Sequence, residues 1–220
     1  MKDTESRTDA EGAPTADLGA NAFYGLEQRP PNRQRRPQNV LPDEQIRALL
    51  GRGLVAHVAT RWDEQPFVTP TSYYYDRTAH AIVFHSNVVG RIRANSERHP
   101  QVSLEVSEFG NFLPSNDPLE VSVQYRSVVA FGRVRVLNTD DVRKALYALL
   151  QKYLPDMRAG REYREISDQD LRRTSVYAVD INHWSGKENW AARAEQTDGY
   201  PLLDERWFTF TNFLEWQKSW

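Results

Sequence analysis

The stretch EVSVQYRSVVAFGRVRVL, residues 120–137, indicates the fold most directly, because apolar and polar residues alternate along it as in a long β-strand. The apolar residues occupy odd positions up to Tyr125 and even positions from Val128 onward. A one-residue change of phase moves side chains to the other face of a strand. We therefore expect a β-bulge or a sharp barrel corner near Arg126 and Ser127.

Shorter segments with strand patterns lie on both sides of this stretch. We expect strands at 54–60, 66–75, 80–85, 101–109 and 174–184, the first three forming an antiparallel meander with turns at 63–65 and 76–78. Helices are expected at 42–50, 89–98, about 139–153 and 167–172. Antiparallel strands with few helices favour a mainly β protein, a closed or split six-stranded antiparallel β-barrel, over a Rossmann sheet.

Capping residues set the expected ends of the helices. Pro42 suits the first position of the first helix and Gly51 its end. Ser86 or Asn87 would cap the second helix, and residue 139 or 140 the third.

Composition limits the chemistry that the chain can perform. Its 220 residues, 40% hydrophobic and 26% charged, carry a net charge of −2 and include no cysteine. This excludes disulfides, thiolate metal sites, iron–sulfur clusters and thiol nucleophiles. The five histidines never occur at i, i+4 spacing, so no metal site is expected. A protein with this little redox chemistry of its own would need an organic cofactor to act as an oxidoreductase.

The charge and the termini bear on partners and location. A net charge near zero gives no general attraction to nucleic acid or to an anionic membrane. There is no apolar run long enough to cross a membrane, and the charged N-terminus does not look like a signal peptide. We expect a cytoplasmic protein that binds neither nucleic acid nor membrane.

The chain divides into three expected parts. Residues 1–40 are an arm rich in Ala, Gly, Pro and charge, whose basic segment 29–37 is expected to be a solvated linker; a clasp on a partner subunit or a weak nucleic-acid contact are the alternatives. Residues 41–195 form the barrel domain. The tail, 196–220, has six aromatic residues near its end, which fit either a packed terminal helix or a lid over a substrate cleft.

Three segments are candidates for ligand binding. In HSNVVGRIR, residues 85–93, a strand leads into a helix start whose free N–H groups, with Gly90 and Arg91, could bind phosphate; an ordinary capped helix with surface arginines is equally compatible. In WSGKENW, residues 184–190, an indole and a lysine could hold a flat anionic ring, or the indole could simply close the core. Pro70 makes segment 68–71 an edge or a bulge, with backbone groups available to a ligand.

In this order and spacing, the three segments resemble the nitroimidazole reductase (Nim) family, which belongs to the pyridoxamine-5′-phosphate-oxidase-like, FMN-binding split barrels. The resemblance runs from about Arg36 to Ala191 and also includes residues 104–108, 112–116, 123–128 and 173–177. It implies a homodimer with one FMN in each of two clefts between the subunits. The residues that it assigns to the cofactor are Val68, Thr69, Pro70, Thr71, His85, Ser86, Gly90, Arg91, Trp184 and Lys187.

The resemblance also implies a role for each group of residues. The phosphate would lie against Ser86, Gly90 and Arg91, and the flavin ring along segment 68–71. Trp184 and Lys187 would close the site from the other subunit. Many members of the family have lysine where this chain has Arg91; both side chains can hold a phosphate, but with different geometry.

The activity that the resemblance implies is reduction of the nitro group of 5-nitroimidazole compounds to an amine, which confers antibiotic resistance. FMN would carry electrons from a reduced nicotinamide or another donor, and His85 could donate protons. Two alternatives stay open. The chain could bind a flavin nucleotide without turnover, or it could bind haem, with His57, His85 or His183 as the axial ligand.

Overall fold

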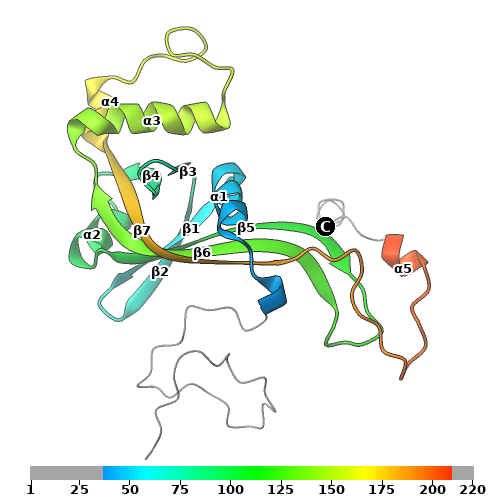
Figure 1. The fold of residues 1–220 in the computed structure, drawn as a ribbon. Helices are drawn as coiled ribbons and strands as arrows, with labels where there is room; N and C mark the ends of the chain where they lie inside the picture. The colour runs from blue at the N-terminus through cyan, green and yellow to red at the C-terminus, as the bar shows by residue number, and fades with distance from the viewer. Residues whose placement is uncertain (1–36, 210–220) are drawn as a thin grey trace, which may run out of the picture.

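The computed structural model describes residues 37–209, and most of their backbone belongs to one antiparallel sheet with helices packed on it (Figure 1). The predicted N-terminal arm lies almost entirely outside these residues. In chain order the elements are the 3-10 helix η1 Pro37–Asn39, α1 Asp43–Arg52, β1 Ala56–Trp62, β2 Gln65–Thr71, β3 Tyr73–Asp76, β4 Ala81–Asn87, α2 Arg91–Arg98, β5 Gln101–Leu113, β6 Ser122–Val136, α3 Thr139–Tyr153, α4 Asp168–Arg173, β7 Thr174–Asn189 and α5 Arg206–Thr209.

The mainly β architecture agrees with the sequence, but the sheet has seven strands, in the order β2-β1-β5-β6-β7-β4-β3. The predicted strand 66–75 divides at Ser72: its first half pairs with β1 and its second half with β4. β2 and β3 thus lie at opposite edges of the sheet although one residue joins them. The sheet must therefore curve until its edges meet at Ser72, but these two edge strands do not pair with each other.

The bulge predicted near Arg126 and Ser127 is wrong. β6 keeps a continuous register there with both neighbours, and the shifts lie elsewhere, between Phe109 and Phe112 on β5 and opposite Phe131 and Gly132 on β7. From Gln124 to Val134 the even-numbered side of β6 is buried or half-buried, and Gln124 is one of its buried residues. Gln124 accepts a hydrogen bond from the Asn111 backbone N–H and donates one to the Ala191 carbonyl. Because Gln124 is polar yet buried with its hydrogen bonds satisfied, the apolar pattern of the sequence suggested a change of phase that the strand does not have.

The helix ends differ from the expected ones, and the difference at the start of α2 leaves its first N–H groups without a side-chain cap. α2 begins at Arg91 with Gly90 as its N-cap and no side-chain cap, because Asn87 Oδ1 instead accepts the N–H of Val89 in the preceding turn. The N-cap of α3 is Asn138, which accepts the N–H of Asp141. α1 continues through Gly51 to Arg52.

Two apolar clusters pack on opposite faces of β4. Ile82 and Phe84 belong to the main cluster inside the curved sheet, which α1 also joins. Ala81 and Val83 belong to a second cluster, which lies between the sheet and α3. Because side chains alternate along a strand, His85 continues the face toward α3 and Ser86 continues the inner face.

The C-terminal segment after β7 runs beside the long ends of β5 and β6 toward α5 (Figure 1). Asn116 anchors it: its Nδ2 donates to the carbonyls of Thr197 (2.9 Å) and Tyr200 (3.1 Å), and its Oδ1 accepts the Thr197 N–H (2.8 Å). Most of the aromatic tail predicted as a helix or lid, from residue 210 onward, lies outside the described residues. Within residues 37–209, no helix is both long and apolar enough to cross a membrane.

Candidate functional site

The end of β4 presents two polar residues to opposite faces of the sheet. The hydroxyl of Ser86 faces inward, 3.0 Å from the Tyr177 hydroxyl, and donates to the Asn87 carbonyl (3.2 Å). The imidazole of His85 faces α3 and has no hydrogen-bond partner within the described part of the chain. These adjacent residues, both predicted to contact a cofactor, therefore meet different surroundings.

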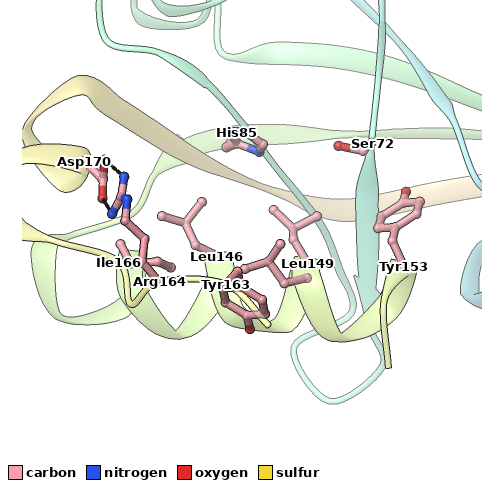
Figure 2. Close-up of a pocket in the computed structure, with 10 residues that line it drawn as sticks. Ser72, His85, Leu146, Leu149, Tyr153, Tyr163, Arg164, Ile166 and Asp170 are labelled. Atoms are coloured by element: carbon pink, nitrogen blue, oxygen red, sulfur yellow. Dashed lines mark hydrogen bonds and ion pairs between the residues drawn. The ribbon is translucent and has the colours of Figure 1, made fainter. Parts of the chain in front are cut away.

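His85 lies on the wall of a cavity of about 410 Å³ between the sheet and α3 (Figure 2). Leu146 and Leu149 project from α3 toward the imidazole. The lining residues are Ser72, His85, Leu146, Leu149, Leu150, Tyr153, Tyr163, Arg164, Ile166 and Asp170. The size and the mainly apolar wall with few polar groups are typical of small-molecule sites.

The surroundings of His85 favour its neutral form. Although part of the ring is open to solvent, the protein around it excludes water and lowers the pKa of His85 below its usual value. The imidazole is therefore neutral at pH 7 and has a free nitrogen lone pair. It could accept a hydrogen bond from a ligand or coordinate a metal-containing cofactor.

An ion pair closes one end of the cavity (Figure 2). Arg164 donates two hydrogen bonds to Asp170, of 2.6 and 2.9 Å, and Asp170 also accepts from the backbone N–H and the hydroxyl of Ser167. The hydrogen bond from Arg164 is the main reason that the pKa of Asp170 lies well below its ordinary value. α3 holds the loop in place, because Arg143 donates to the Ile166 carbonyl and to Asp168.

Ser72 and Tyr153 lie at the other end of the cavity (Figure 2). The Tyr153 hydroxyl accepts the N–H of Tyr73 (2.9 Å) and donates to the Leu54 carbonyl (2.6 Å). Burial raises the pKa of Tyr153, so the hydroxyl keeps its proton. This residue thus fixes the end of α3 to the corner where the two edges of the sheet meet.

A second cavity, of about 350 Å³, is lined by His85, Ser86, Asn87, Asp170, Arg173 and Thr174. It shares His85 and Asp170 with the first cavity, so it continues from the end at which Asp170 lies. Every residue of its wall is polar, in contrast to the first cavity.

The start of α2 lies next to the edge strand β2. The Arg91 guanidinium stacks 4.2 Å from the ring centre of Phe67, the residue before the predicted flavin-binding segment 68–71. Within the described residues Arg91 has no carboxylate partner, and the first N–H groups of α2 have no side-chain cap. β2 pairs with β1 alone, and the side chains of Val68 and Pro70 are exposed. The structure therefore brings Arg91, Gly90 and segment 68–71 together.

Trp184 and Lys187 lie elsewhere in the same chain. Ser175 pairs with Ser86, and Trp184 follows nine positions later, about 30 Å along a strand. The indole Nε1 donates to Asp43 Oδ1 (2.9 Å), and the ring lies edge-on to His80. Lys187 is exposed, 5.2 Å from the ring centre of Tyr125.

Sequence reasoning missed the residues that enclose His85, all of which follow β6 except Ser72. The signals present were the apolar stripe of α3 and the Ser167–Asp170 capping box. Neither shows that α3 and the 163–170 loop lie opposite His85. The described residues contain no cluster of His, Asp or Glu suited to a metal ion.

Comparisons with known proteins agree with the fold. Residues 42–188 match the sequence profile of a family described as pyridoxamine 5′-phosphate oxidase. No curated protein matches the chain.

Several solved structures share the fold. An FAD- and haem-binding protein from Mycobacterium smegmatis is 23% identical, with a TM-score of 0.64 over 72% of this chain and 76% of that one. A flavocytochrome from Azotobacter vinelandii is 20% identical, with a TM-score of 0.64 over 74% and 80%. A candidate 5-nitroimidazole antibiotic resistance protein from Bacteroides thetaiotaomicron is 19% identical, with a TM-score of 0.57 over 68% and 86%.

Proposed function

The chain belongs to the pyridoxamine 5′-phosphate oxidase family, and we propose that it is an FMN-dependent oxidoreductase with a split-barrel fold that reduces nitro groups of 5-nitroimidazole-type compounds. The observation that carries the flavin assignment is Arg91, which has no carboxylate partner in the described residues, at the uncapped start of α2 and beside the edge strand β2. Flavin-binding and nitroimidazole-resistance proteins share the fold, which supports the proposal.

The residues present fit a flavin nucleotide. Arg91 and the free N–H groups of α2 would bind the phosphate, because a helix start and a guanidinium both favour an anion. Gly90 leaves the approach open: the nearest atom to an added Cβ there is the Asn87 carbonyl oxygen at 3.5 Å. The exposed backbone of segment 68–71 would lie along the ring. The Ser86 hydroxyl, which donates to the Asn87 carbonyl in the free protein, would turn its single proton to the phosphate and keep the Tyr177 hydroxyl as its other partner.

The bound flavin would supply electron or hydride transfer, and the chain would orient it and the substrate. A nitro group also consumes protons as it becomes an amine. His85 would relay these protons from solvent, because its lowered pKa keeps the ring neutral and ready to exchange a proton. Trp184 and Lys187 are too far along β7 to reach Arg91 of their own chain, so in this proposal they come from the second subunit of a homodimer.

Reconstitution followed by anaerobic turnover tests the proposal. We expect the purified chain to take up FMN and, with reduced nicotinamide or dithionite, to convert a 5-nitroimidazole to its amine, as measured by mass spectrometry. Free FMN with the same reductant is the control. A protein that takes up no flavin contradicts the whole proposal. Flavin uptake without faster amine formation contradicts the enzymatic part and leaves a flavin-binding protein.

One observation favours haem as a second candidate cofactor. Of the three histidines considered as axial ligands, His57 is 3.1 Å from Glu105 Oε2 and His183 is exposed on β7 opposite Phe131. Only His85 combines an imidazole without a partner in the described residues with a mainly apolar cavity. A haem-binding protein and a flavocytochrome also share the fold.

Adding haemin to the apoprotein tests this candidate by the shift of the Soret band. We expect one equivalent to bind and the shift to disappear in His85→Ala, with His57→Ala and His183→Ala as matched controls. A shift that persists in His85→Ala would exclude His85 as the ligand.

A further inference from the structure

The second cavity has an excess of positive charge that neither cofactor assignment uses. Two charged residues line it, Asp170 and Arg173. Asp170 is already neutralised by its two hydrogen bonds from Arg164, and Ser167 supplies further donors. The Arg173 guanidinium has no ion pair or hydrogen bond to any side chain of residues 37–209. The unmatched charge of this cavity is therefore that of Arg173.

Part of the remaining wall can also bind an anion. Asn87 and Ser86 carry polar side chains at the end of β4, and Thr174 follows Arg173 at the start of β7. The Thr174 hydroxyl donates to the Asp170 carbonyl (2.9 Å), which ties it to α4. Within the described residues the side-chain amide N–H groups of Asn87 have no acceptor, because only its Oδ1 is engaged, whereas the Ser86 hydroxyl already donates to a carbonyl. An anion is bound well where a guanidinium and a neutral N–H donor converge. Nothing apolar interrupts this lining.

The two cavities are continuous at His85 and Asp170 but differ in chemistry. Leucine, isoleucine and tyrosine side chains form most of the wall on the α3 side, and polar side chains form the other. Each cavity is within the size range of small-molecule sites. A ligand that fills both must have an apolar body and a polar, negatively charged end.

We propose that the paired cavities bind an apolar small molecule with an anionic group, its body packed between α3 and His85 and its charge held by Arg173. The apolar part of this site lies on the α3 face of the sheet, and the polar part reaches Ser86, which is also assigned to the flavin phosphate. The proposal does not depend on FMN at Arg91. Two kinds of molecule have the required chemistry: an aromatic carboxylate or sulfonate, and haem, whose propionates are anionic. Arg173 is the residue that selects for charge in either case.

A matched pair of fluorescent probes tests the selection for charge. 8-Anilinonaphthalene-1-sulfonate is anionic, and N-phenyl-1-naphthylamine is a neutral compound of similar shape. We expect the folded full-length protein to bind one equivalent of the sulfonate at least tenfold more tightly than the amine. Arg173→Gln should remove most of that difference, since a hydrogen-bonded ion pair in a partly enclosed site contributes about tenfold in affinity or more.

Arg172→Gln is the matched control, because Arg172 is an exposed residue of the same helix that does not line either cavity. Leu146→Phe, which fills the apolar cavity, should weaken both probes. The proposal is overturned if the wild type binds both probes equally, or if Arg172→Gln and Arg173→Gln have the same effect.

Two further measurements distinguish haem from an aromatic anion as the ligand, and distinguish this inference from the flavin assignment. If haem is the ligand, haemin will displace the sulfonate with a Soret shift, and Arg173→Gln will weaken haemin binding tenfold. If haemin does not displace the probe, the site takes an aromatic anion. Flavin uptake by each variant is measured in parallel. Normal flavin uptake with no preference for the anionic probe would contradict this inference alone. Loss of flavin uptake with an intact preference for the anionic probe would contradict only the flavin assignment.

Discussion

The segments around His85–Arg91 and Trp184–Lys187 are both rich in chemically capable side chains, but the fold treats them differently. In the first, His85 and Arg91 have no hydrogen-bonding or charged side-chain partner in the described residues, and α2 starts without a side-chain cap. In the second, the Trp184 indole N–H is bonded to Asp43, and Gly186 is packed against Leu41 and Ile46. In the first segment His85 and Arg91 are available to a ligand, although Ser86 and Asn87 are bonded internally. In the second, Trp184 and Gly186 make internal contacts and Lys187 is exposed.

This difference indicates where a ligand can gain binding energy. A ligand that meets an unpaired guanidinium or imidazole adds a hydrogen bond without breaking one inside the protein. A ligand at Trp184 within the same chain would have to compete with an existing bond. Substitutions in the first segment should therefore affect ligand binding, and those in the second should mainly affect stability.

The largest effect is expected from Gly186→Val. A Cβ at this position would lie 2.6 Å from Ile46 Cγ1 and 2.9 Å from Leu41 Cβ, so α1 and the chain before it must move. We expect the free energy of unfolding in urea to fall by about 3 kcal/mol. Gly51→Ala is the control: an added Cβ there meets nothing within 4 Å, and the helical position should gain up to about 1 kcal/mol. Equal stability of the Gly186→Val variant and the wild type would refute the close packing.

The next largest effect is expected from Arg91→Ala, and it concerns FMN affinity. Loss of a charge-assisted hydrogen bond to phosphate should weaken FMN binding about thirtyfold, or about 2 kcal/mol. Titration of the apoprotein with FMN, followed by flavin fluorescence, measures this. Arg98→Ala, in the same helix but paired with Asp63 (2.6 Å), should bind FMN as the wild type does. Similar losses in both variants would mean that Arg91 has no special role.

A smaller effect is expected from Trp184→Phe. The substitution removes the 2.9 Å hydrogen bond to Asp43, which should lower the free energy of unfolding by about 1 kcal/mol. FMN affinity should change little, because phenylalanine keeps an aromatic ring. Urea denaturation and FMN titration of the same sample separate the two roles. A loss of FMN affinity as large as that of Arg91→Ala would contradict the contrast between the segments.

The smallest effect concerns the pH dependence of stability through His85. Its pKa is lowered in the folded state by burial, so the unfolded chain takes up a proton at higher pH than the folded one. As the pH falls below about 6.5, the usual pKa of histidine, stability should decrease until the lower folded pKa is reached. Denaturation across pH 5 to 8 should show a shallower decline for His85→Gln. Parallel curves for the two proteins would show that His85 is not desolvated.

Local patterns predicted the elements around the site, but not every boundary. Alternation and capping residues gave the strand that ends near His85 and the helix that follows it. The cap at Gly90 was missed because Asn87, a good capping residue, bonds to Val89 in the turn instead. The strand 66–75 was read as continuous because its residues favour a strand throughout. Its division at Ser72 follows from pairing partners that are distant in sequence.

The sequence by itself determined the mainly β class, the lack of thiol chemistry and the polar segment 85–91, because composition and short-range periodicity depend only on neighbouring residues. The tertiary structure alone decided which of these polar groups stay unpaired. His85 and Ser86 are adjacent, yet one faces the cavity under α3 and the other bonds to Tyr177. That outcome depends on α3, the 163–170 loop and β7, which contact β4 only when the chain folds. Local sequence patterns cannot predict such long-range contacts, because they reflect only neighbouring residues.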